Sequence, residues 1–192
     1  IDTASGKVIK AIPTGMNPND MELGSDGRLY VANGNENTVT VIDTKAMRPI
    51  ETINVGLTSK APEGATPNGL ALDRKNNMLF VANADNNTVA LVDIKTANDS
   101  EVEGFIPTGW YPTGVLFSPD GRQLAFIEGD AIYSSKRQIQ KAALSGGAPT
   151  ALFDYDMFHR GDWAEDGWIY WTAQYPGGIV RMRDSGGAVE PV

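Results

Sequence analysis

VANGNENTVTVID at Val31–Asp43 returns almost unchanged as VANADNNTVALVD at Val81–Asp93, 50 residues later. The segments before the two copies also match, since Pro18-Asn19 precedes the first and Pro67-Asn68 precedes the second. A third start of the same kind follows at Pro112. Self-similarity at a period of roughly 40 to 50 residues is typical of a repeat architecture, so the repeat decides the fold before any single residue does.

Each repeat has the pattern of four short strands separated by turns. In the first repeat the expected strands are residues 21–23, 29–33, 38–42 and 50–55. Val, Ile, Thr and Tyr dominate these segments, as they do in half-buried strands. Gly, Asn, Asp and Pro dominate the breaks, where they favour turns. Four strands per repeat predict an all-β fold, a β-propeller of four-stranded antiparallel blades.

The repeats divide the chain into a single propeller domain of four blades. The expected bounds are residues 16–56, 57–109, 110–154 and 155–192. Residues 1–15 align without gaps onto residues 42–56, which end in an outer strand. They therefore predict an outer strand without a blade of its own, which would latch the ring by covering an exposed edge. The alternative is a longer propeller of which this strand is one part.

The composition excludes several classes of protein. The chain has 192 residues, 41% of them hydrophobic, which suffices for one buried core. A net charge of −8 argues against nucleic acid as a partner, because phosphate-binding surfaces need clustered Lys and Arg. No apolar run is long enough for membrane insertion. The absence of Cys excludes disulfides, thiol catalysis and Cys-ligated zinc.

Candidate ligand-binding residues lie in the loops that lead to each innermost strand. These loops have the pattern Gly-x-x-Pro, and propeller ligands generally sit at the funnel that such loops surround. The candidates are Asn17, Asn19, Asn68, Trp110 and Tyr111. A purely structural role for the same residues is the competing interpretation.

Signals for catalysis or for a metal are weak. His159 is the only His, and with Asp162 it is the best metal candidate, although one His among loop carboxylates is a poor ligand set. No nucleophile elbow or other catalytic motif occurs, so no catalytic residue and no cofactor is predicted. The repeated Asn residues, such as Asn37 and Asn87, are expected to cap the turn between the second and third strands.

The sequences of the repeats are similar to those of two known kinds of propeller. Through LYVANGNENTVTVIDT and LFVANADNNTVALVDI, residues 1–121 resemble the YVTN-type, YncE-like repeats of bacterial periplasmic and secreted proteins. Residues 122–192, with QIQKAALSGGAPTALFD and SGGAVEPV, resemble TolB-type or WD40-like Pro-Asp (PD40) blades. The change falls inside the third blade. It indicates a chimera, formed by natural recombination or by engineering, and the resemblance implies a periplasmic or secreted location.

The main functional prediction is a non-catalytic scaffold or protein-binding module. Four blades can close alone, or two copies can form an eight-bladed ring, so self-association as a homodimer is expected if the four blades do not close. The alternative, from the resemblance, is a periplasmic propeller enzyme or enzyme subunit. It would be lactonase-like or dehydrogenase-associated, with a ligand or metal in the central channel.

Overall fold

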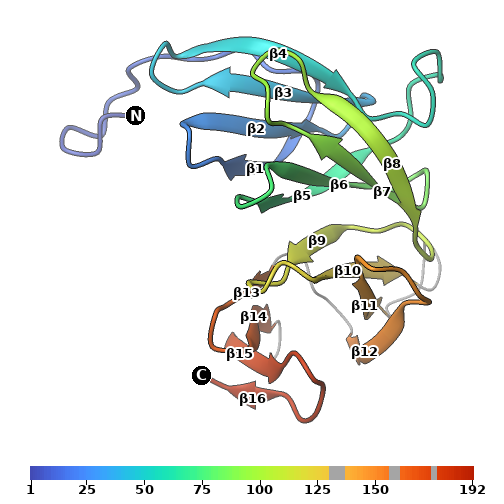
Figure 1. The fold of residues 1–192 in the computed structure, drawn as a ribbon. Helices are drawn as coiled ribbons and strands as arrows, with labels where there is room; N and C mark the ends of the chain where they lie inside the picture. Colours follow the sequence, from blue (N-terminus) through green and yellow to red (C-terminus); the bar gives the residue numbers. More distant parts are fainter. Residues whose placement is uncertain (130–136, 156–160, 174–176) are drawn as a thin grey trace.

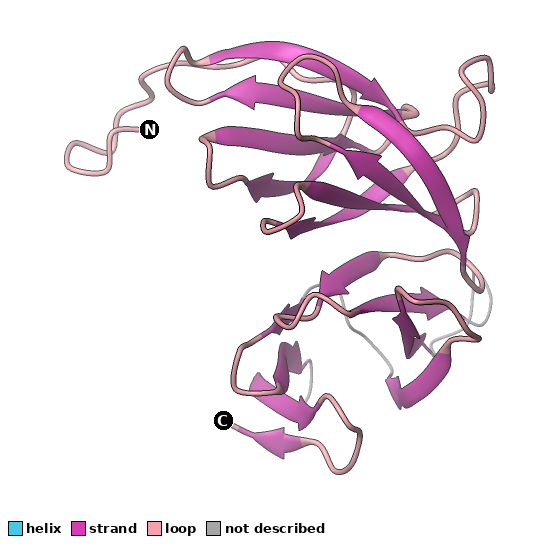
Figure 2. Cartoon of the chain, viewed as in Figure 1, coloured by secondary structure: helices cyan, strands magenta, loops and turns pink. Residues whose placement is uncertain are grey.

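A computed structural model of the chain describes residues 1–129, 137–155, 161–173 and 177–192. The chain is all-β, as Figures 1 and 2 show. The described residues contain no helix, and therefore none that is long and apolar enough to cross a membrane.

The described strands form four antiparallel sheets of four strands each. Blade 1 holds β1 (Pro18–Leu23), β2 (Arg28–Asn33), β3 (Thr38–Asp43) and β4 (Arg48–Asn54). Blade 2 holds β5 (Pro67–Asp73), β6 (Met78–Asn83), β7 (Thr88–Asp93) and β8 (Glu101–Pro107). Blade 3 holds β9 (Gly114–Phe117), β10 (Gln123–Gly129), β11 (Arg137–Ala143) and β12 (Thr150–Tyr155). Blade 4 holds β13 (Gly161–Trp163), β14 (Trp168–Ala173), β15 (Gly178–Arg183) and β16 (Glu190–Pro191).

The sheets are arranged as a four-bladed β-propeller, which confirms the predicted fold class. In each blade the strands follow one another in chain order, and the first strand is the innermost. The innermost strands β1, β5, β9 and β13 contact one another in succession. Figure 1 shows the blades along an arc, with blade 1 and blade 4 at its two ends.

Alternation along the strands places one row of apolar side chains on each face of a blade. In β2, Tyr30 and Ala32 face blade 2, whereas Val31 faces the other way. The buried side chains form one cluster at each junction of consecutive blades, and a fully buried side chain such as Phe80 contributes about 1.5 to 3 kcal/mol. Among the described residues, no such cluster joins blade 4 to blade 1.

The predicted N-terminal outer strand is not formed. Residues 1–15 contain a turn but no strand, and Val8 and Ile9 are exposed. The segment reaches blade 1 itself, where the Gly15 N–H donates to Thr40 Oγ1 at 3.3 Å. No latch forms, because blade 4 already has β16 as its fourth strand, paired with β15.

The repeated Asn residues Asn37 and Asn87 connect one blade to the loop that enters the next blade. Asn37 is buried in the turn between β2 and β3, and its Oδ1 accepts the N–H groups of Gly64 and Ala65 at 3.0 and 2.7 Å. Both donors lie in the loop that enters blade 2. The matching Asn87 accepts the N–H of Tyr111, in the loop that enters blade 3, at 2.8 Å. Each Asn therefore holds the Gly-x-x-Pro loop of the next blade, which corrects the turn-capping interpretation.

We expect Asn37→Ala to lower the free energy of unfolding by about 1 to 3 kcal/mol, because the N–H groups of Gly64 and Ala65, the second of them buried, lose their acceptor. Urea unfolding of the purified chain measures this change. Asn35→Ala is the matched control, since Asn35 is exposed and its Oδ1 accepts a long hydrogen bond, 3.5 Å, from Asn17 Nδ2. Equal losses in the two variants would contradict the proposed role of Asn37.

A second prediction concerns Tyr30, whose hydroxyl is buried without a hydrogen bond among the described residues. The matching residue of blade 2 is Phe80, so Tyr30→Phe should leave stability at neutral pH unchanged or raised. Burial raises the pKa of the Tyr30 phenol from 10.0 to about 12. Its contribution to stability is complete below pH 10 and is lost as the pH rises to 12. The variant should therefore lose less stability over that pH range than the wild type, as measured by urea unfolding.

Candidate functional site

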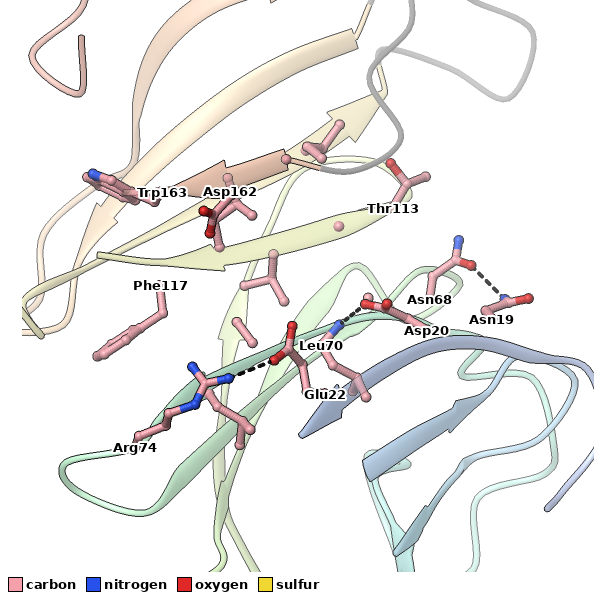
Figure 3. A pocket seen from close by; sticks show the side chains of 18 residues that line it. Asn19, Asp20, Glu22, Asn68, Leu70, Arg74, Thr113, Phe117, Asp162 and Trp163 are labelled. Atoms are coloured by element: carbon pink, nitrogen blue, oxygen red, sulfur yellow. Dashed lines mark hydrogen bonds and ion pairs between the residues drawn. The ribbon is translucent and has the colours of Figure 1, made fainter. Parts of the chain in front are cut away.

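The innermost strands of all four blades line one hollow, which we call the inner groove (Figure 3). Its volume is about 310 Å³. Its polar side chains are those of Asn19, Asp20, Glu22, Asn68, Arg74, Thr113 and Asp162. Its larger apolar side chains include those of Leu70, Leu72, Val115, Phe117, Ile127 and Trp163. Small-molecule sites are usually hollows that combine apolar side chains with a few polar groups.

β-Bulges lie at the end of this groove where β1 and β5 begin. The register of β1 shifts between Pro18 and Asp20, and that of β5 shifts at the matching place, so Asn19 and Asn68 are the extra residues. A bulge redirects a side chain away from the regular alternation of the strand. The two amides meet across the blade junction, where Asn19 Nδ2 donates to Asn68 Oδ1 at 2.8 Å (Figure 3).

Acidic side chains of β1 also reach across to blade 2. Asp20 Oδ2 accepts the N–H of Leu70 at 2.9 Å, which satisfies a donor on the inner edge of β5. Glu22 forms an ion pair with Arg74, with Oε2 and Nη2 3.3 Å apart (Figure 3). With Asp162 from β13, the groove holds three carboxylates and one guanidinium, a formal charge of −2. Its field therefore favours a cation over an anion.

The loops that enter the first three blades share a strained backbone. Asn17, Thr66 and Tyr111 have φ values of 54°, 52° and 51°, and each directly precedes a Pro. Left-handed φ is unfavourable for residues such as Thr and Tyr, so surrounding contacts must hold it. The hydrogen bond from Tyr111 to Asn87 is one such contact. This conformation carries the chain from the loop into the innermost strand.

The candidate ligand-binding residues separate into two groups. Asn19 and Asn68 line the inner groove, whereas Asn17, Trp110 and Tyr111 do not. Trp110 is 47% exposed in the loop before β9. Trp110 and Tyr111 are kept out of the groove because the chain reaches the innermost strand only after the following Pro. Whether any of these five residues binds a ligand stays a prediction.

Of the two metal candidates, His159 lies outside the described residues. Asp162 is exposed on β13 and lines the groove. The described part of the chain brings together no group of three or more His, Asp or Glu side chains that could hold a metal ion.

Sequence reasoning did not identify Glu22, Arg74 and Phe117, which line the groove away from Asn19 and Asn68. Arg74 and Phe117, with Trp163, also border a second hollow of about 400 Å³ toward the turn at Asp120. Alternation from Asn19 and Asp20 could have identified Glu22, since side chains two apart share a face. The places of Arg74 and Phe117 in the groove depend on how the blades meet, which no local pattern contains.

The wall of the groove depends on a close approach of β5 and β9. A Cβ atom added at Gly69 would lie 2.7 Å from the Cα atom of Gly114. Such a distance is too short for two carbon atoms without a shift of one strand. Glycine at this position therefore sets the distance between the innermost strands of blades 2 and 3.

We expect Gly69→Ala to destabilise the chain by about 1 to 3 kcal/mol, because the backbone of β9 must move. Gly104→Ala is the matched control, since Gly104 also lies in a strand and a Cβ atom there would meet nothing within 4 Å. Thermal unfolding of both variants tests the prediction. A loss of stability in Gly104→Ala that equals the loss in Gly69→Ala would contradict it.

No protein-family model and no curated protein matches the sequence. Solved structures do match it. A chain of a nidogen/laminin complex has a TM-score of 0.66 at 15% identity, over 88% of this chain and 62% of that one. A streptogramin B lyase has a TM-score of 0.65 at 16% identity, over 93% and 55%. Hydrazine synthase of Kuenenia stuttgartiensis has a TM-score of 0.52 at 17% identity, over 96% and 67%.

The chain thus spans about 55 to 67% of the length of these three neighbours. At such low identity the likeness shows the fold alone. The chain is similar in fold to these proteins, and the nidogen and lyase structures are β-propellers.

Proposed function

We propose that this chain is a non-catalytic propeller module that binds a small polar cation in the inner groove. The observation that carries the proposal is the convergence of the four innermost strands on one hollow with a formal charge of −2. The groove is roughly the size of a small-ligand pocket. The sequence offers no nucleophile elbow or other catalytic motif to act on what is bound there.

The arrangement of groups in the groove limits the chemistry of the ligand. At the end of the groove where β1 and β5 begin, the amides of Asn19 and Asn68 and the hydroxyl of Thr113 suit a hydroxylated molecule. Further along, Asp162 suits an ammonium group, and Trp163 offers an apolar wall. A small sugar with an amino group combines these properties.

Glucosamine, glucose and glucuronate form a matched series of cation, neutral molecule and anion for isothermal titration calorimetry. We expect glucosamine to bind most tightly and glucuronate most weakly. Asp162→Asn should weaken glucosamine binding by up to about fivefold, because an exposed charge pair contributes about 1 kcal/mol or less. Glu63→Gln, in the exposed loop that enters blade 2, is the charge-matched control and should leave the affinity unchanged. The proposal would be overturned if glucuronate bound as tightly as glucosamine, or if none of the three molecules bound.

No specific observation favours the enzyme alternative. Two of the similar structures are enzymes by name, a lyase and a synthase, but they share only 16% and 17% identity with this chain. A lactonase-like mechanism needs a metal in the channel, and the described residues supply no cluster for one. Metal analysis of the purified chain, before and after chelation, would reveal such a site.

The finer family assignment is also a proposal. Residues 1–121 are proposed to be YVTN-type, YncE-like blades and residues 122–192 TolB-type or WD40-like blades. In support, the strained residue before Pro recurs at Asn17, Thr66 and Tyr111, all of which lie within the first part. A chain of two blade types is consistent with a chimera.

A further inference from the structure

One face of blade 1 carries an apolar surface that matches a blade junction, but none of the described blades packs against it. Its exposed residues are Met21 and Leu23 of β1, which are 55% and 53% exposed. The matching residues of blade 2 are Leu70 and Leu72, which are 3% and 6% exposed because they pack on blade 1. The strand register supports this match, since Met21 pairs with Val31 as Leu70 pairs with Val81.

The rest of this face follows the same pattern. Val31 and Ile42 take the places of Val81 and Val92, which belong to the core between blades 1 and 2. Val31 and Ile42 are buried, although no blade lies against them. The segment before β1 lies on this face, because the Gly15 N–H donates to Thr40 Oγ1, and Thr40 is the cross-strand partner of Val31. The segment leaves the β1 side of the face uncovered.

Blade 4 has the complementary free face. Ile169 and Trp171 of β14 pack on blade 3, so Tyr170 points to the opposite face. Tyr170 and Ile179 take the places that Tyr30 and Val39 have in blade 1, where these residues pack on blade 2. Ile179 is 54% exposed. Blade 4 therefore presents a partly apolar surface at the positions that elsewhere receive the next blade.

The face of blade 4 is more polar than the one in blade 1, because Arg181 replaces Val41. Its guanidinium lies over the ring of Trp168, with Cζ 4.1 Å from the centroid, and it forms an ion pair with Glu190 at 3.4 Å. Stacking and pairing reduce the cost of covering this charge. A mixed face of this kind suits a surface that is soluble alone and covered in a complex.

We propose that a second copy of this chain covers the free face of blade 1 with the free face of its own blade 4. Continuity with the three existing junctions supports this occupant, because the two faces carry residues at the positions that build those junctions. Each copy has one face of each kind, so two copies related by a two-fold axis cover all four faces at once. The product is an eight-bladed ring, within the usual size of propellers. This proposal does not depend on a ligand in the inner groove.

Size-exclusion chromatography with light scattering on the full chain tests the ring. We expect a mass of twice 20.6 kDa for the wild type at about 100 μM. Leu23→Asp should reduce this to the mass of one chain. Leu57→Asp is the matched control, because Leu57 is 50% exposed but lies in the loop between blades 1 and 2, and this variant should stay dimeric. Circular dichroism establishes that each variant is folded, and Met21→Asp replaces Leu23→Asp if the latter is not.

Variants of blade 4 distinguish the proposed contact from a dimer of two blade 1 faces. Ile179→Asp alone should also give single chains. A mixture of Leu23→Asp with Ile179→Asp should recover part of the dimer, because one of its two junctions is then free of substitutions. A wild type that stays a single chain would overturn the proposal. So would Ile179→Asp remaining fully dimeric, or Leu57→Asp dissociating the dimer as Leu23→Asp does.

Discussion

Burial of both faces of each sheet is the constraint on which this structure depends. A four-stranded blade with apolar side chains on two faces cannot bury them alone, so consecutive blades must pack on each other. Tyr30 and Leu70 belong to the core of the first junction, and Phe80 and Phe126 to that of the second. Ile127 and Ile169 belong to the core of the third. The two end faces follow the same positional pattern without a neighbour, and the proposed ring rests on this difference.

Hydrogen bonds at the blade junctions turn this packing into a site. Asn37 and Asn87 hold the loops that enter the next blade, and these loops deliver the innermost strands to the centre. Those strands then approach so closely that Gly69 has no room for a side chain. The polar groups on their edges consequently converge, and a groove with excess negative charge is the result.

Much of the fold was predictable because its signals are local. Alternating apolar residues and Gly, Asn or Pro turns predicted the strands of blade 1 to within a few residues. The predicted outer strand in residues 1–15 was wrong, because a strand needs a partner edge and sequence similarity alone does not provide one. In the site, Asn19 and Asn68 were predictable from the loops before them. Phe117 was not, since its place depends on the meeting of blades 2 and 3.

The doubled phrase at Val31–Asp43 and Val81–Asp93 by itself determined a repeat of four-stranded blades, because periodicity and turn residues act over a few neighbouring residues. Only the tertiary structure decided what its Asn residues do and where they act. Asn37 accepts hydrogen bonds from residues 27 and 28 positions away, in the loop that enters the next blade. Tertiary structure also decided which apolar faces are covered, because burial depends on what stands opposite a strand rather than on the strand's own residues.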